Sequence, residues 1–420
     1  MHSLDTPTAA EAMAPRHRVA LAGCMFLITA SFGFLQPFVP LFWEASGLTR
    51  AEIGLVGGFG SGVALLVQPF LGKLSDRLDA RRPVMMLAAI ASGLAYFAYQ
   101  WAVNPWMFFV LTAIGVNGTL YLNAAGCVII GRIAGPRSGG AVYAAYRVWG
   151  SVGYIVVALL SGWLISGVYA SAGDMSRSAL VPVFRWGPAI FGAIALLCTV
   201  IPDRRVQKPH NAHAGGEASS GPSVGASRRV LRPFLISFFL YQFALYGASA
   251  YLSLFMKSLG ATPMWITGTF AAGVVCEVLV MMRIGRISDR IGRKPVLAVA
   301  FVLMPLRLLC YIPATGPLWV LMVQLLHGLN FGIMGAVAVA YVNDVANDRD
   351  RGAAQASLAS AGGLAVAIGP AVCGLIAQRH GIGAMFGTMA LVGAAGAVLF
   401  LARVPESNPV DRLRRLSPRG

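Results

Sequence analysis

The sequence predicts an all-α integral membrane protein with twelve transmembrane helices in two six-helix halves. Hydrophobic residues make up 57% of the chain and charged residues only 12%, whereas soluble domains carry about 25% charged residues. A bilayer span needs about 20 apolar residues, and runs of that length recur throughout the 420-residue chain. The charged side chains are too few to cover a soluble surface, so a soluble globular protein is excluded.

The chain begins with a polar segment, residues 1–18, that contains Asp5 and Glu11. It lacks the basic-then-apolar order of a cleaved signal peptide, so we expect a cytoplasmic N-terminal tail. Residues 19–201 form the expected N-terminal six-helix bundle. Each apolar run is expected to be a helix, because lipid offers the backbone no hydrogen-bond partner. Its expected spans are 19–43, 51–72, 83–101, 106–132, 139–168 and 184–201.

A segment rich in Gly, Ser, Ala and basic residues follows, without hydrophobic periodicity, at residues 202–232. This composition is typical of a flexible linker, which we expect to be cytoplasmic. Residues 233–402 form the expected C-terminal six-helix bundle, and residues 403–420 a basic cytoplasmic tail. The spans of the second bundle are expected at 233–256, 263–284, 295–313, 317–342, 352–378 and 382–402.

The 33 basic residues lie mostly in alternate segments between the spans. If both termini are cytoplasmic, the outer loops hold only Arg50, Arg177, Arg185, Lys257 and Arg379. Cytoplasmic loops carry an excess of Lys and Arg, so this distribution predicts cytoplasmic termini. It also accounts for the net charge of +17 without a nucleic-acid partner.

A polar motif occurs twice, once in each half. The loop after span 2 reads GKLSDRLDARRPV from Gly72, and the loop after span 8 reads GRISDRIGRKPV from Gly285. Recurrence at the same place in each half indicates a duplicated six-helix bundle.

With both motif copies present, the whole chain resembles the major facilitator superfamily, whose signature is the G-x-[LI]-S-D-R loop. The first copy departs from the pattern at Asp79 and Ala80. The resemblance implies gating by these loops, with Asp76 facing the start of span 11 near Gly352 and Asp289 facing span 5 near Gly139. The alternative is that the loops only reverse the chain and follow the charge rule. The expected gating residues are Gly72, Asp76, Arg77, Gly285, Asp289 and Arg290.

Four ionisable residues lie deep within the expected spans: Arg147, Glu277, Arg307 and His327. An ionisable side chain at this depth indicates a functional site, because its burial needs a partner or a water-filled cavity. At about 1.5 Å per helical residue, Glu277, Arg307 and His327 fall at similar depths in the second half. We expect a buried Glu277–Arg307 ion pair and a proton relay with His327; the alternative is a static packing network.

Two segments resemble one branch of the superfamily, which groups lactose permease-like, nucleoside:proton and phenylpropionate-type transporters. They are YRVWGSVGY from Tyr146 and QLLHGLNFG from Gln324. The resemblance implies substrate binding by Arg147 and proton coupling by Arg307 and His327, with Glu277 as the span-8 carboxylate. The chain departs from the permease at Asn330 and in span 4, where amides replace acids. The expected substrate-binding residues are Arg147, Tyr146, Asn117, Asn123, Gln36, Tyr241, Gln242 and Asn330.

These features predict a secondary active transporter that moves an organic acid, sugar or nucleoside by alternating access, as a proton symporter. The alternative is a proton-coupled efflux antiporter, disfavoured because span 5 lacks a G-x-x-x-G-P motif. The sequence contains no catalytic motif that would predict an enzyme. His210 and His213 lack further ligands for a metal site, and no cofactor is expected. The expected partners are the substrate, protons and the lipid bilayer, for a monomer in a bacterial inner membrane.

Overall fold

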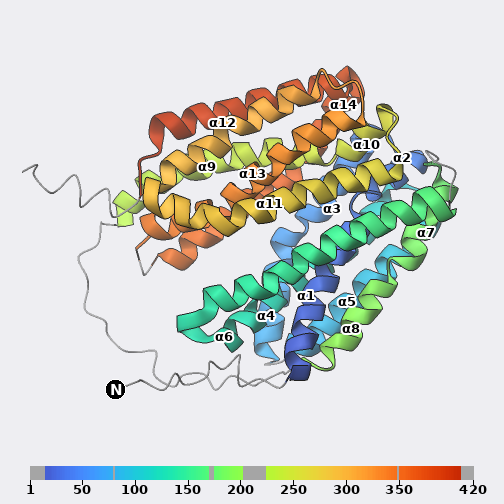
Figure 1. Cartoon of the computed structure of the whole chain (residues 1–420), viewed down its shortest axis with the longest axis horizontal. Coiled ribbons are helices and arrows are strands. Elements are labelled where there is room, and N and C mark those ends of the chain that lie inside the picture. Colours follow the sequence, from blue (N-terminus) through green and yellow to red (C-terminus); the bar gives the residue numbers. More distant parts are fainter. Residues whose placement is uncertain (1–14, 79–80, 170–174, 202–223, 348–349, 408–420) are drawn as a thin grey trace, which may run out of the picture. The chain divides into compact units, whose positions relative to one another are not determined.

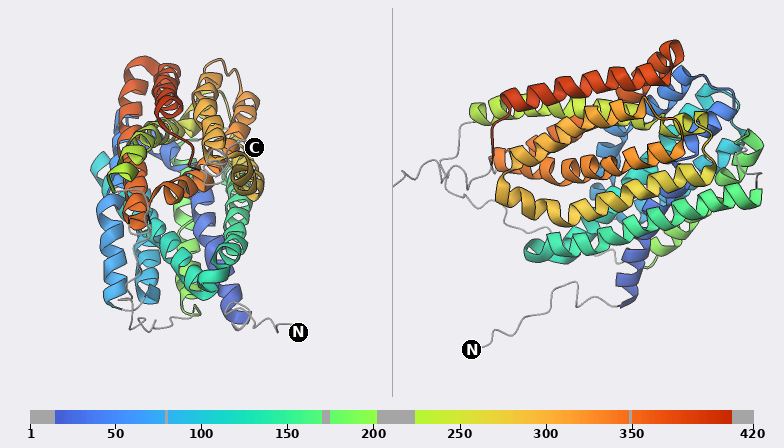
Figure 2. Two further views of the ribbon diagram at one scale, coloured as in Figure 1. Left: turned by 90° about the vertical axis from the view of Figure 1, so that its left-hand side faces the viewer. Right: turned by 45° about the horizontal axis from the view of Figure 1, so that its top comes forward.

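The computed structural model describes residues 15–78, 81–169, 175–201, 224–347 and 350–407. Every regular element among these residues is a helix (Figure 1 and Figure 2). Eleven helical stretches are long and apolar enough to cross a membrane. One of them, Arg351–Arg403, holds two spans, because its backbone leaves the helical conformation at Gly381, where φ is 85°. The expected fold class is confirmed.

The chain forms two compact units. The first contains Met1–Leu48, Val63–Gln207 and Ala261–Ala271, and the second contains Thr49–Gly62, Lys208–Gly260 and Ala272–Gly420. The expected spans 2 and 8 are each divided between the two units. Residues 49–62 pack with α14 inside the second unit, and Thr267 lies against Gly162 of α6 inside the first.

Proline and glycine break several spans of the first unit into shorter helices. Span 1 is interrupted at Pro37, because proline lacks a backbone N–H and restricts the residue before it. The next helix begins at Val39, with Pro40 in its first turn. Pro188 separates the two helices of span 6 in the same way. The helices of spans 1 to 6 are α1 (Pro15–Leu35), α2 (Val39–Ala45), α3 (Arg50–Gly62), α4 (Ala64–Arg77), α5 (Arg81–Ala98), η1 (Tyr99–Trp101), α6 (Pro105–Leu164), η2 (Ile165–Tyr169), α7 (Arg177–Trp186) and α8 (Ala189–Cys198).

Helix α6 contains spans 4 and 5, with helical backbone where the sequence predicted a loop. It includes the candidate spans Pro105–Gly131 and Ala145–Gly167. The side chains of residues 132–144, including Gly139, lie outside the described set. Small residues hold α1 close to α6: a Cβ atom on Gly153 would lie 2.2 Å from the carbonyl oxygen of Phe26. Such close approach is how membrane helices gain packing energy.

The second unit contains α9 (Val224–Ser249), α10 (Leu252–Ser258), most of α11 (Pro263–Ile291), α12 (Arg293–Tyr311), α13 (Pro317–Val345) and α14 (Arg351–Arg403). Helix α9 begins inside the expected linker 202–232, of which residues 202–223 are not described. Phe301 of α12 stacks on Phe400 of α14 with ring centroids 4.3 Å apart. The part of α14 that follows Gly381 therefore runs beside α12 (Figure 1).

Candidate functional site

Arg147 lies where α1 and α6 of the first unit approach each other. The hydroxyl of Thr29 on α1 donates to the carbonyl oxygen of Gly150 on α6. Arg147 is half-buried, and its Nη1 lies 3.4 Å from Oγ of Ser151, one turn along α6. Among the described residues, the Arg147 side chain makes this one long hydrogen bond. A guanidinium carries five N–H donors, so most remain for a ligand or solvent.

The other first-unit candidates do not form one cluster. The amide of Asn117 donates along its own helix to the carbonyl oxygen of Ala113 at 2.7 Å, and its backbone carbonyl accepts from Nε2 of Gln68 at 2.8 Å. Asn123 and Tyr146 are half-buried, and Gln36 is exposed beyond the end of α1. No hydrogen bond joins Gln36 to the other candidates within the described residues.

A polar network lies inside the second unit, between α12 and α13. Nε and Nη2 of Arg307 donate to the hydroxyl of Tyr311 at 3.2 and 3.1 Å. Nη2 also donates to Oε1 of Gln324 at 3.1 Å, and the Tyr311 hydroxyl donates to the same oxygen at 2.7 Å. Arg307 is only 2% exposed, and its Nη1 has no hydrogen-bond partner in the described part of the chain.

Aromatic rings enclose this network. The ring of Tyr311 packs against Phe255 and Phe386, with centroids 6.3 and 5.0 Å apart. The guanidinium carbon of Arg307 lies 5.6 Å from the centre of the Tyr311 ring, within the range of a cation–π interaction. The guanidinium is therefore stabilised by a phenol, an amide and a ring face.

His327 lies on α13, about one turn beyond Gln324. Its ring centroid is 5.2 Å from that of Phe331, and its Nδ1 is buried without a hydrogen-bond partner among the described residues. A Cβ atom on Gly273 of α11 would lie 3.3 Å from Gln324 and 3.5 Å from His327. The absence of a side chain at Gly273 therefore leaves room for both.

Glu277 is also buried, at 7% exposure, and its backbone lies against α13, where a Cβ on Gly328 would come within 2.5 Å of the Glu277 nitrogen. The expected Glu277–Arg307 ion pair stays a prediction. Arg307 directs its donors to Tyr311 on its own helix and to Gln324 on α13. The sequence placed the charges at similar depths but did not show which way each faced.

Tyr241 and Asn330 lie in the helix packing of the second unit. The Tyr241 hydroxyl donates to the carbonyl oxygen of Asn330 at 3.2 Å, and Nδ2 of Asn330 donates to the carbonyl oxygen of Ala300 at 2.9 Å. Both side chains have no exposed surface. They join α9, α12 and α13 rather than line a cavity.

Gln242, the next residue along α9, does line a cavity. This cavity has a volume of about 380 Å³ and is formed by α9, α13 and α14. A second cavity of about 180 Å³ shares its Phe238, Gln242, Tyr246, Val339 and Leu358. Of the substrate-binding residues predicted for the second unit, Gln242 is therefore the one that lines a cavity large enough for a ligand.

The two motif loops carry local ion pairs. Asp76 pairs with Arg81 at 2.5 Å in the first loop, where Asp79 and Ala80 lie outside the described residues. In the second loop, Asp289 pairs with Arg293 at 2.5 Å, and Nε of Arg293 donates to Asp344 of α13 at 3.1 Å. Arg77 and Arg290 are exposed. A Cβ on Gly72 or Gly285 would meet no described atom within 4 Å.

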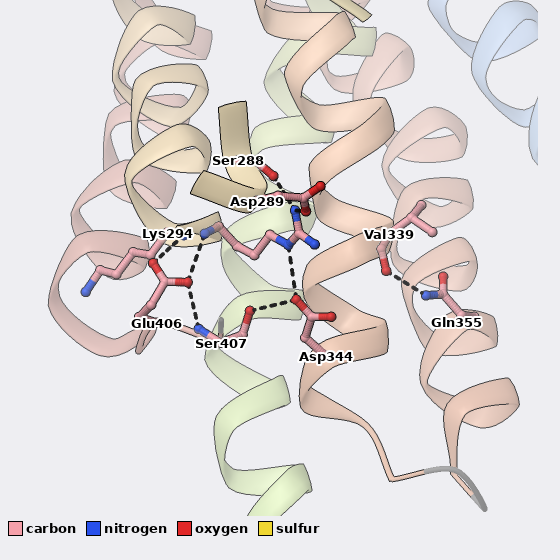
Figure 3. Close-up of polar contacts among 9 residues, drawn as sticks. Ser288, Asp289, Lys294, Val339, Asp344, Gln355, Glu406 and Ser407 are labelled. Carbon is pink, nitrogen blue, oxygen red and sulfur yellow. Dashed lines mark hydrogen bonds and ion pairs between the residues drawn. The ribbon is translucent and has the colours of Figure 1, made fainter. Parts of the chain in front are cut away.

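Glu406, which the sequence analysis missed, caps the start of α12. Its carboxylate accepts from the backbone nitrogens of Arg293 at 2.9 Å and Lys294 at 3.0 Å (Figure 3). A carboxylate at a helix N-terminus satisfies backbone N–H groups that have no intrahelical partner. Gly292 has a φ of 105°, and a Cβ there would lie 2.5 Å from Oε2 of Glu406, so glycine is required. In the sequence, the sign of this role was a carboxylate directly after Pro405.

The match of residues 18–388 to the model of the MFS_1 like family covers most of the chain. The chain belongs to this family of major facilitator transporters. The transporter is 27% identical over 388 residues to an uncharacterized MFS-type transporter of Mycobacterium tuberculosis, with 88% of each chain covered. It is 26% identical to the maltose permease of Geobacillus stearothermophilus, covering 90% of this chain and 92% of the permease.

A third relative of the transporter is the multidrug resistance protein MdtG of Proteus mirabilis, 28% identical, with 68% of this chain and 71% of MdtG covered. A structure of the nucleoside transporter NupG aligns with a TM-score of 0.71 at 16% identity, covering 92% of this chain and 98% of that one. These similarities establish a multi-pass membrane transporter rather than an enzyme. The activities in the names of these relatives differ, so the similarities do not select the branch that the sequence motifs resemble.

Proposed function

We propose that the transporter is a proton symporter for a small polar molecule of the organic acid, sugar or nucleoside class. The supporting observation is the buried group around Arg307. A guanidinium in a membrane interior is costly, and here it donates to a phenol and an amide inside the second unit. Packing alone would be served at lower cost by apolar side chains, so a charge kept at this site favours a functional role.

Proton coupling in this proposal falls to Glu277, Arg307 and His327. An imidazole gains and loses a proton near neutral pH, and His327 lies on the same helix as Gln324, which is bonded to Arg307. Protonation of His327 would add a positive charge near the guanidinium. The proton and the Arg307 network would then influence each other, which is the condition for coupling.

Substrate binding in the first unit falls to Arg147, whose donors are mostly unused, with Tyr146, Asn117, Asn123 and Gln36 as further candidates. In the second unit it falls to Gln242, while Tyr241 and Asn330 act as supports from the helix packing. The motif residues Gly72, Asp76, Arg77, Gly285, Asp289 and Arg290 are proposed to control access from the cytoplasmic side.

Reconstitution of the full chain into proteoliposomes containing a pH-sensitive dye tests this function. Uridine, 4-hydroxybenzoate and maltose represent the three substrate classes. We expect one of them to acidify the vesicle interior when added outside, and its radiolabelled form to accumulate. Accumulation without acidification would contradict symport, and the absence of both for all three would contradict the substrate range.

Efflux by proton antiport is the second candidate, favoured by the similarity to MdtG and by the largely apolar lining of the second-unit cavity. In an antiporter, protons leave the vesicle as the substrate enters. Lipophilic cations such as ethidium, added to the same vesicles, would then make the interior alkaline. That result would replace symport with efflux as the function.

A further inference from the structure

The 380 Å³ cavity of the second unit has a largely apolar wall. Its volume falls in the range of about 300–1,000 Å³ that is usual for small-molecule sites. Phe238 and Tyr246 contribute aromatic rings, and Phe331 adds a third in the adjoining cavity. Among the residues that the structure describes, no charged side chain lines either cavity. Such a wall favours an uncharged, apolar part of a ligand, and aromatic walls favour a ring.

The polar side chains of the wall are Gln242, Tyr246 and Gln355, and Gln355 is already engaged. Nε2 of Gln355 donates to the carbonyl oxygen of Val339 at 3.0 Å and to Oδ1 of Asn343 at 2.8 Å, and Figure 3 shows Gln355 directed toward Val339. A sugar would bring several hydroxyl groups, each of which loses hydrogen bonds to water on entry and needs a replacement. Gln242 and Tyr246 are too few to replace the hydrogen bonds of all these hydroxyl groups, so the wall disfavours a sugar.

Gln242 differs from Gln355, because its Oε1 is buried and has no hydrogen-bond partner among the described residues. Leaving a buried acceptor unsatisfied costs about 1–3 kcal/mol. Rotation of the amide about its last side-chain bond would turn this oxygen toward a ligand in either cavity, since Gln242 lines both. A hydroxyl or amino group on the ligand would supply the missing donor.

Glycines keep part of the wall open. A Cβ on Gly362 would lie 3.6 Å from the ring of Phe238, and in the adjoining cavity a Cβ on Gly335 would meet no described atom within 4 Å. Gly362 and Gly363 leave flat backbone in the wall contributed by α14. A flat surface of this kind accommodates the face of a planar ring.

We infer that this cavity binds an aromatic or heteroaromatic ring of the transported molecule, and that Gln242 accepts a hydrogen bond from a hydroxyl or amino group on that ring. The inference rests on the proposed transport function. It narrows the substrate class to ring-bearing organic acids and nucleosides and excludes sugars.

A matched pair of probes tests this inference on the purified full chain. 4-Hydroxybenzoate carries the donor, whereas 4-methoxybenzoate keeps the ring and carboxylate but cannot donate. Affinity is measured from the concentration dependence of thermal stabilisation. We expect the wild type to bind 4-hydroxybenzoate about tenfold more tightly, which corresponds to about 1.4 kcal/mol. We expect Gln242→Leu to bind both probes equally and Gln100→Leu, in the first unit, to keep the tenfold preference.

Several results would overturn the inference: equal binding of the two probes by the wild type, an unchanged preference in Gln242→Leu, binding of maltose alone, or binding of none. If Gln242→Leu does not fold, Gly362→Leu provides the test, because Gly362 lines this cavity beside the ring of Phe238, so a larger side chain there should weaken binding of 4-hydroxybenzoate at least tenfold. Unchanged binding in that variant would also overturn the inference.

The outcome is separable from that of the proposed function. Proton-coupled uptake of 4-hydroxybenzoate with an unchanged preference in Gln242→Leu would refute the ring site and leave symport standing. The expected preference without proton movement in proteoliposomes would support the ring site and refute symport.

Discussion

Tyr311 on α12 donates its hydroxyl proton to Oε1 of Gln324 on α13 at 2.7 Å. The same hydroxyl oxygen accepts two N–H groups of Arg307. One phenol therefore links two helices and stabilises a buried cation. The network lies in the interior of the second unit, where water cannot replace a lost partner.

Replacing Tyr311 with Phe should reduce stability by about 1–3 kcal/mol, because it leaves buried N–H donors of Arg307 unsatisfied. Thermal unfolding of the purified protein measures the loss. Tyr341→Phe is the matched control, since it removes one neutral hydrogen bond, to the carbonyl oxygen of Pro405 at 3.0 Å. Equal losses in the two variants would contradict the role of Tyr311 as the main partner of the guanidinium.

Two glycines on α13 should respond in opposite ways to alanine. A Cβ at Gly328 would lie 2.5 Å from Cβ of Cys276 and from the backbone nitrogen of Glu277. Gly328→Ala should therefore destabilise the protein by about 1–3 kcal/mol. Gly335→Ala meets no described atom and should be neutral or stabilising by up to about 1 kcal/mol, because alanine favours a helix over glycine. Similar unfolding temperatures for both variants would show that α11 and α13 are not closely packed at Gly328.

Glu406→Ala should loosen the start of α12, because two backbone N–H groups lose their acceptor. Loss of a helix cap costs about 0.5–2 kcal/mol. Hydrogen exchange followed by mass spectrometry should show faster exchange in peptides covering Arg293 and Lys294. Glu52→Ala, which removes the acceptor for the backbone nitrogen of Thr49, should leave exchange in α12 unchanged. Unaltered exchange in Glu406→Ala would mean that the cap does not hold this helix end.

Asp289→Asn tests the gating role of the second motif loop. The change weakens the ion pair with Arg293 and removes a negative charge from the loop. We expect the cytoplasmic side to open more often, so that a maleimide labels a single-cysteine reporter on that side more rapidly. Labelling at the wild-type rate would restrict Asp289 to a local role.

Much of the fold could be predicted because the bilayer limits the choices. Each apolar run had to be a helix of membrane-spanning length, and the orientation indicated by the charges between the runs stays a prediction. Helix breaks within spans were harder to place, since residues such as Pro37 end one helix whereas Pro69 lies inside another, α4. Neighbouring helices can compensate for a proline, and their positions are not in the sequence pattern.

The site was less predictable, because sequence gives depth along a helix but not direction around it. Tyr241 and Gln242 are adjacent, yet the first is buried in packing and the second lines a cavity. Successive helical residues point about 100° apart, and only the packed structure shows which direction is the cavity. For the same reason Tyr311, one turn from Arg307 on α12, was overlooked as a partner of the guanidinium.

The most direct test of proton coupling is a comparison of wild type and His327→Gln in proteoliposomes with a substrate that the wild type transports. Two readouts are needed: exchange of radiolabelled substrate at equal concentrations, and substrate-driven acidification of the interior. If His327 carries the proton, the variant should keep exchange and lose acidification. Acidification at the wild-type rate in His327→Gln would contradict the assignment of His327.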